Sequence, residues 1–157
     1  MSVKPVPDGF STVTLHLTVK NCAEAIEFWK KALGATEVAR HPMPDGRIMH
    51  AMIKIGDSVI MMADEFPEMG GFSPLHYGGS GFAINLYVDN VDALWKRATD
   101  AGMSVEMPLD NQFWGDRYGQ LSDPYGFTWA LSQHVKDLTP EEMGKAAEAA
   151  FAHNPTN

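Results

Sequence analysis

The sequence predicts an α+β fold built from two tandem strand-helix-three-strand (βαβββ) units. A segment near the start of each half alternates apolar and polar side chains, which is typical of a half-buried strand. Each of these segments precedes an apolar stripe at helical spacing and then three short strand-like runs. The same order recurs at a nearly constant offset, because Thr14 aligns with Ala83, 69 positions later, and Gly56 with Gly126, 70 positions later. We therefore predict an internal duplication.

The first unit is predicted over residues 11–65. Its opening segment, STVTLHLTVK (11–20), places valine and leucine on one face and threonine and His16 on the other. The next segment is expected to form a helix with Asn21 as N-cap, Glu24 completing a capping box, and Gly34 as the stop. Three short strands follow, at residues 35–41, 47–56 and 57–64.

The second unit is predicted over residues 81–134, after a linker at 66–80 that is rich in glycine and proline. Beyond it, Thr139 as N-cap and Glu142 as its capping-box partner predict a last helix over residues 139–152. The elements expected within the second unit are a strand at 83–88, a helix from about 89 to 102, and strands at 103–108, 117–123 and 127–133.

Composition limits the possible partners. The chain has 157 residues, of which 45% are hydrophobic, and this suffices to bury a sizeable core. The formal net charge of −8 opposes contact with phosphates, so we expect no nucleic-acid partner. No apolar run reaches the roughly 20 residues of a membrane helix, and the N-terminus lacks the core of a signal peptide, so we expect no membrane partner and a cytoplasmic location. Cys22 is the only cysteine, which excludes an internal disulfide and a cysteine-rich zinc site.

Three stretches carry a family resemblance: QFWGDRYGQLSDPYGFTWALSQH (112–134), MMADEFPEMGG (61–71) and LTPEEM (138–143). With the duplicated unit, they are similar to the PhnB-like branch of the vicinal oxygen chelate superfamily, which includes glyoxalase I, extradiol dioxygenases and bleomycin-binding proteins. The resemblance covers residues 11–134 and implies the glyoxalase/bleomycin-resistance fold, in which the two units form a half-barrel-like cavity. Fold transfers further than function from such a likeness.

The resemblance also implies where a metal ion would bind, namely at side chains on the first and last strands of each unit. His16 fills the first of these four positions, and Asn85 stands at the equivalent place in the second unit. Counting from the glycine turns gives Ala130 and Ile60 for the other two, with Asp64 as the nearest acid if the count slips. A catalytic divalent metal needs about three protein ligands. The inherited metal site is therefore predicted to be lost, and no cofactor is expected.

A divalent metal ion is the alternative. His50 is expected on the cavity face of its strand, so His16, His50 and Asp64 could form a two-histidine, one-carboxylate set. Against this set, the superfamily's strand order separates the strands of His16 and His50 by about 9 to 10 Å. With such a site the chain would be a metal-dependent lyase, isomerase or dioxygenase, and Tyr87 or Tyr118 would act as acid or base.

The segment DNQFWGDRYG (110–119) supplies further candidates. Trp114 and Tyr118 are expected to stack on a planar ligand, and Arg117 to grip a carboxylate or phosphate with two hydrogen bonds. The alternative is structural: Asp116 and Arg117 form an ion pair that locks the turn, and Trp114 fills the end of the barrel.

The leading hypothesis is a small-molecule-binding protein that holds a compact planar or anionic ligand, with drug sequestration as one version. The acidic charge would suit a cationic drug. A homodimer with its cavity at or near the subunit interface is also expected, from the resemblance and from the apolar last helix. Whether the protein is an enzyme is left open by the sequence. The predicted ligand-binding residues are His16, His50, Asn85, Tyr87, Trp114 and Arg117.

Overall fold

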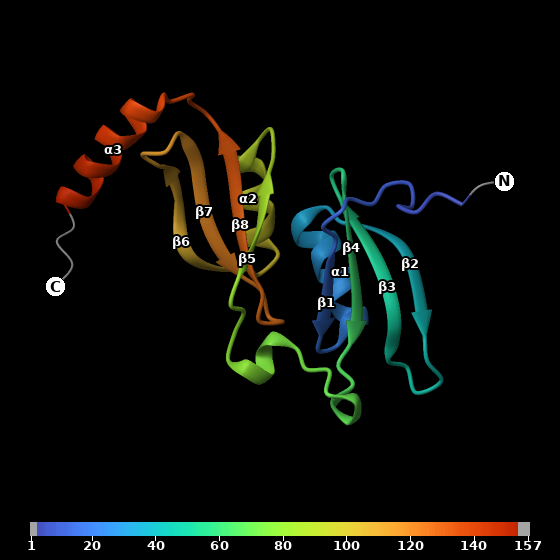
Figure 1. Cartoon of the computed structure of the whole chain (residues 1–157). Coiled ribbons are helices and arrows are strands. Elements are labelled where there is room, and N and C mark those ends of the chain that lie inside the picture. Colours follow the sequence, from blue (N-terminus) through green and yellow to red (C-terminus); the bar gives the residue numbers. More distant parts are fainter. Residues whose placement is uncertain (1–2, 154–157) are drawn as a thin grey trace.

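The computed structural model describes residues 3–153 and confirms the α+β class and the duplication (Figure 1). The predicted domain ends at residues 1–2 and 154–157 lie outside the described residues. The first unit consists of β1 (Leu15–Val19), α1 (Cys22–Leu33), β2 (Thr36–Pro42), β3 (Ile48–Ile55) and β4 (Ser58–Asp64). The second consists of β5 (Ala83–Tyr87), α2 (Val91–Asp100), β6 (Ser104–Asn111), β7 (Asp116–Ser122) and β8 (Thr128–His134). Two 3₁₀ turns, Pro67–Met69 and Pro74–Tyr77, connect the units, and α3 (Pro140–Ala152) follows the second.

Each unit forms one four-stranded mixed sheet, and the two sheets have the same topology. Their strand orders are β1-β4-β3-β2 and β5-β8-β7-β6, and the sheets do not close into a barrel. The first and last strands of each unit pair in parallel, so that His16 lies beside Met61 and Asn85 beside Ala130. The predicted strand over 11–20 is shorter than expected and begins at Leu15, where its parallel pairing with Ile60 of β4 begins.

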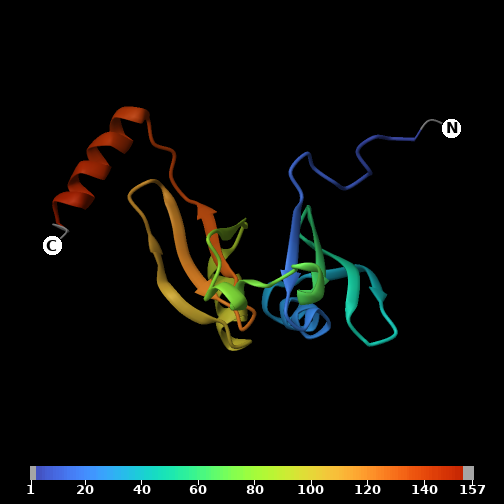
Figure 2. The ribbon, with the colours of Figure 1, turned by 60° about the horizontal axis from the view of Figure 1, so that its bottom comes forward.

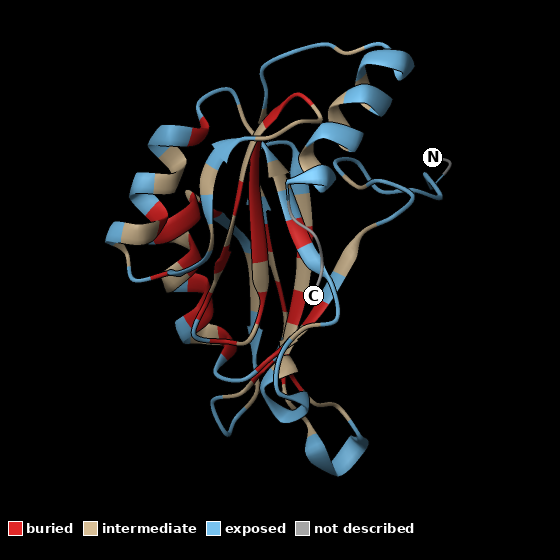
Figure 3. Ribbon diagram, turned by 90° about the vertical axis from the view of Figure 1, so that its left-hand side faces the viewer, coloured by how far each residue is buried: buried red, intermediate tan, exposed pale blue. Residues whose placement is uncertain are grey.

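Alternation along the strands separates a buried face from an open face in both sheets. Helices α1 and α2 lie on the same side of the molecule, and the buried residues face them (Figure 3). Neither helix covers the opposite, open faces. Helix α3 stands away from the sheets in both views (Figures 1 and 2), and none of its residues is buried. No helix within residues 3–153 has the length and apolar character needed to cross a lipid bilayer.

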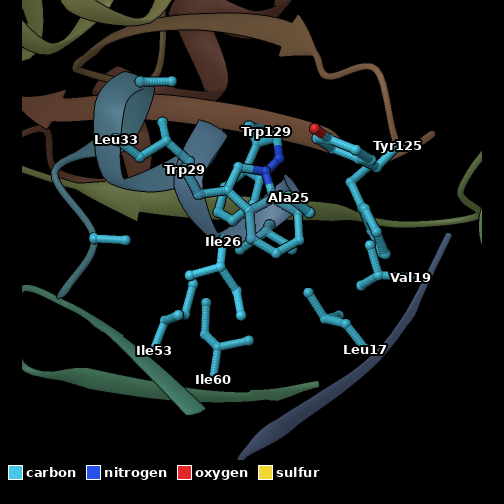
Figure 4. Close-up of a cluster of buried hydrophobic side chains, with 14 of the residues drawn as sticks. Leu17, Val19, Ala25, Ile26, Trp29, Leu33, Ile53, Ile60, Tyr125 and Trp129 are labelled. Carbon is cyan, nitrogen blue, oxygen red and sulfur yellow. The ribbon is translucent and has the colours of Figure 1, made fainter. Parts of the chain in front are cut away.

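A cluster of aromatic side chains joins the two units (Figure 4). Trp29 of α1 and Trp129 of β8 are fully buried, with ring centroids 5.6 Å apart at an interplanar angle of 64°. Both indole N–H groups donate to one oxygen of Asp123, at 2.9 and 2.8 Å. The second oxygen accepts from the backbone N–H groups of Tyr125 and Phe127. Asp123 therefore holds the glycine turn of the second unit against the helix of the first.

The start of α1 differs from the prediction. Asn21 has a left-handed backbone and its side chain makes no capping hydrogen bond, so the predicted capping box is wrong at this helix. Asp64, at the end of β4, takes that role: it accepts from the backbone N–H of Cys22 at 2.8 Å and from that of Ile48 at 2.7 Å. A carboxylate at a helix N-terminus is favourable. At α3 the predicted capping box between Thr139 and Glu142 is confirmed.

Candidate functional site

The open faces of the two sheets bring together most of the polar and aromatic side chains that the sequence singled out. On the first sheet this face carries His41, His50, Met52, Met61 and His16. On the second it carries Asn85, Tyr87, Ala130, Ser132, His134, Asp116, Tyr118 and Gln120. Beside β5, a hollow of about 340 Å³ lies between residues 85–88 and the turn 55–58.

Asp116 is the centre of the hydrogen-bond network on the second sheet. It is 5% exposed and accepts from Tyr87 Oη at 2.7 Å and from Trp114 Nε1 at 3.2 Å. Its other oxygen lies 2.8 Å from Nδ1 of His134, and Nε2 of the same ring lies 2.8 Å from Asp137. A buried carboxylate with three side-chain partners fixes the position of each partner. Asp116 thus holds Tyr87 and Trp114 in place.

The network shifts the pKa of its members in consistent directions. Burial acts to raise the pKa of Asp116, but hydrogen bonds from Tyr87, His134 and Trp114 outweigh it and lower that pKa. The hydrogen bond to Asp116 raises the pKa of Tyr87, so its hydroxyl stays protonated and serves as a donor. Hydrogen bonds to Asp116 and then Asp137 raise the pKa of His134. When His134 is protonated, its imidazolium balances the charge of the buried carboxylate.

We expect stability to depend on pH through His134. Because its pKa is higher in the folded protein than in the unfolded chain, its contribution is complete below about pH 6.5 and is lost as pH rises through the folded pKa. NMR titration of the imidazole protons should give a pKa above the ordinary value, and Asp116→Asn should lower it. An unchanged His134 pKa in Asp116→Asn would contradict this network.

The motif WGDR at residues 114–117 supplies side chains to both faces of the second sheet. Trp114 packs edge-on against Tyr118, with ring centroids 5.4 Å apart, on the open face. Arg117 points to the other face and makes two hydrogen bonds with Asp92 of α2, at 2.9 and 2.7 Å. The predicted Asp116–Arg117 ion pair is therefore wrong. The guanidinium of Arg117 is already engaged by Asp92, so its placement does not support the predicted role in ligand binding.

The first sheet brings His16 and His50 together but leaves Asp64 apart. The two imidazole centroids are 6.2 Å apart although β4 lies between their strands. Asp64 is on the buried face, where Cys22 and Ile48 occupy both of its oxygens. The two-histidine, one-carboxylate set proposed from the sequence is therefore not formed.

The four positions at which the superfamily would hold a metal ion can now be assigned from the strand register. The register places Met61, not Ile60, beside His16, in the same way as it places Ala130 beside Asn85. One imidazole, a thioether, an amide and a methyl group do not make a site for a catalytic divalent metal. Within residues 3–153 no group of three His, Cys, Asp or Glu side chains has the geometry to hold a metal ion.

This topology, with a helix-free face on each duplicated sheet, defines a protein of the glyoxalase type. The family model for the glyoxalase/bleomycin resistance protein/dioxygenase superfamily matches residues 10–131, and the chain belongs to that superfamily.

Individual proteins resemble the chain over most of its length. An uncharacterised protein of Mycobacterium bovis is 41% identical over 134 residues, which are 83% of this chain and 88% of the relative. A PhnB protein from Bacillus cereus, described as a putative 3-demethylubiquinone-9 3-methyltransferase, shares the fold at a TM-score of 0.60 and 18% identity, over 78% of this chain and 99% of that one. TnmS3, an antibiotic binding protein from Streptomyces sp. CB03234, has a TM-score of 0.58 and 25% identity, over 86% and 99%.

Two members of the site were missed by reasoning from the sequence. Asp116 was interpreted as part of a turn, and His134 was assigned no role. Strand alternation offered a signal for both, because Asp116 shares a face with Tyr118, and His134 with Ala130 and Ser132. Their meeting depends on the pairing of β7 with β8, which sets Asp116 opposite His134.

Proposed function

We propose that the protein binds a compact planar small molecule on the open faces of its sheets, without a metal ion at the superfamily's ligand positions. The observation that carries this proposal is the Asp116 network, which fixes the Tyr87 and Trp114 side chains, with Tyr87 paired across the sheet with the small side chain of Ser132. Tyr87 is 63% exposed, so its ring is available for stacking. Fixed aromatic rings bind planar ligands at a low cost in conformational entropy.

The charge distribution supports a cationic ligand over an anionic one. Arg117, the cation that the sequence assigned to an anionic group, is paired with Asp92 on the other face of the sheet. The net charge of −8 attracts cations to the protein as a whole. Sequestration of a planar cationic drug or metabolite is the version that we favour. The description of TnmS3, which shares this fold, as an antibiotic binding protein supports this version.

The proposal includes a homodimer in which a second copy covers the open faces. Phe82, just before β5, exposes 50% of its surface, and Tyr87, at the end of β5, exposes 63%. The apolar stripe of α3, which includes Met143 and Ala147, is only half-buried. An exposed apolar surface of this kind is typical of an interface.

A panel of probes tests the proposed function. We expect ethidium, berberine or metal-free bleomycin to bind in the presence of EDTA, and the planar anion 8-anilinonaphthalene-1-sulfonate to bind less tightly. Trp114→Leu should weaken binding by about tenfold, since an aromatic contact contributes about 0.5 to 1.5 kcal/mol. Isothermal titration calorimetry gives the affinities, and light scattering on the same samples gives the molar mass.

Arg117→Gln is the matched control, because Arg117 lies in the same motif as Trp114 but faces α2. Its affinity for the probes should stay within about twofold of the wild type. A ligand that binds only when a divalent metal is added, or that binds Trp114→Leu as tightly as the wild type, would contradict the proposal.

A further inference from the structure

Three imidazole rings form a row across the open face of the first sheet. His41 of β2 and His50 of β3 are direct cross-strand partners, with ring centroids 6.2 Å apart and planes inclined by 17°. His16 continues the row on the other side of His50. In contrast to His134, none of the three forms an ion pair with an acidic side chain within the described residues 3–153. The row lies on the first sheet and is separate from the Asp116 network of the second.

We propose that His41 and His50 together bind a divalent transition-metal ion such as Ni²⁺, Cu²⁺ or Zn²⁺. Neutral imidazole is a preferred ligand of these ions. With metal–nitrogen distances of about 2.0 to 2.1 Å, two imidazoles on one ion have their centroids about 5 to 6 Å apart. The observed 6.2 Å lies close to this range, and rotation about the side-chain bonds would turn one nitrogen of each ring toward a shared ion. His41 is exposed and His50 half-buried, so an ion can reach both rings, and water completes its coordination.

The backbone geometry favours His41 over His16 as the partner of His50. Directly paired residues of neighbouring strands have Cβ atoms about 4.5 to 5.5 Å apart. His16 and His50 are not direct partners, because β4 separates their strands. An ion bound by both His41 and His50 would therefore bridge two strands that are already paired, β2 and β3. This site is distinct from the four superfamily positions, of which only His16 has an imidazole.

Titration of chelator-stripped protein with NiCl₂, followed by calorimetry at pH 7.5, tests the proposal. We expect one Ni²⁺ per chain. His41→Ala and His50→Ala should each weaken binding by about 100-fold or more, because a second ligand on the same surface raises affinity by about 10² to 10⁴. Ni²⁺ should also raise the Tm of the wild type but not that of either variant. Circular dichroism without metal confirms that both variants are folded.

His16→Ala is the matched control, because it removes the third ring of the row. Its affinity for Ni²⁺ should stay within about threefold of the wild type. The proposal is overturned if His16→Ala weakens binding as much as His50→Ala while His41→Ala does not, since the ion would then bind between His16 and His50. It is also overturned if none of the three substitutions changes the affinity for Ni²⁺, or if the wild type does not bind Ni²⁺. The small-molecule probes are measured with EDTA present, so the two proposals fail separately.

Discussion

Asp123→Ala is expected to lower the free energy of unfolding by about 3 to 5 kcal/mol. The substitution leaves the indole N–H groups of Trp29 and Trp129 without their acceptor in the core. It also leaves two backbone N–H groups of the glycine turn unpaired. A buried donor without a partner costs about 1 to 3 kcal/mol, and local relaxation and entry of water reduce the sum. Chemical denaturation followed by tryptophan fluorescence measures the loss.

The carboxylate of Asp123 is held in the core against an unfavourable environment. Burial raises its pKa, and the four N–H donors act in the opposite direction. Asp123→Asn keeps one carbonyl oxygen as acceptor and should therefore lose less stability than Asp123→Ala. Asp57→Ala is the matched control, since Asp57 is an exposed acid in the corresponding turn of the first unit and its removal should change stability by no more than about 0.5 kcal/mol. Equal denaturation midpoints for Asp57→Ala and Asp123→Ala would refute the role given to Asp123.

Gly115→Ala should lower the free energy of unfolding by about 3 kcal/mol. Gly115 has a φ of +100°, which costs a residue with a Cβ about 1 to 2 kcal/mol. An added Cβ would also collide with the backbone carbonyl oxygen of Lys136. The chain cannot easily move away, because the N–H groups of Val135 and Lys136 both donate to the carbonyl of Gly115 at 3.0 Å. Overpacking of this kind costs about a further 1 to 3 kcal/mol.

Gly46→Ala separates the two causes. Gly46 has a φ of +88°, but no atom lies within 4 Å of an added Cβ. Its substitution should therefore cost only the backbone strain, about 1 to 2 kcal/mol. We also expect Gly115→Ala to weaken binding of the planar probes, because it displaces Trp114, whereas Gly46→Ala should not. If the two alanine variants were equally stable, the contact between residues 115 and 136 would not matter.

The WGDR motif can now be explained residue by residue. Trp114 contributes a ring to the open face, and Gly115 allows the chain after β8 to pass close by. Asp116 organises the network, and Arg117 ties β7 to α2. Two of the four residues thus serve the site directly, and two hold the strand in position. A motif of this kind is diagnostic of the fold without revealing the ligand.

The individual strands and helices were predicted correctly where the spacing of apolar residues along the chain was sufficient to identify them. The alternation in β1 and β5 and the stripes of α1 and α2 identified both units, because burial of one face imposes the period directly on the sequence. The same alternation places Arg117 and Tyr118 on opposite faces of β7. The sequence-based hypothesis nevertheless assigns both to one ligand site, although both lie within the predicted strand at 117–123. That error could have been avoided from the sequence.

By itself, the sequence determined the duplicated fold and the approximate positions of the strands and helices. Only the tertiary structure decided that Asp64 caps α1, that Asp116 joins Tyr87 to His134, and that His41 stands beside His50. The physical reason is that the apolar periodicity of a strand or helix depends only on residues that are close together in the chain. The partner of a side chain depends on the register between strands that lie far apart in the chain.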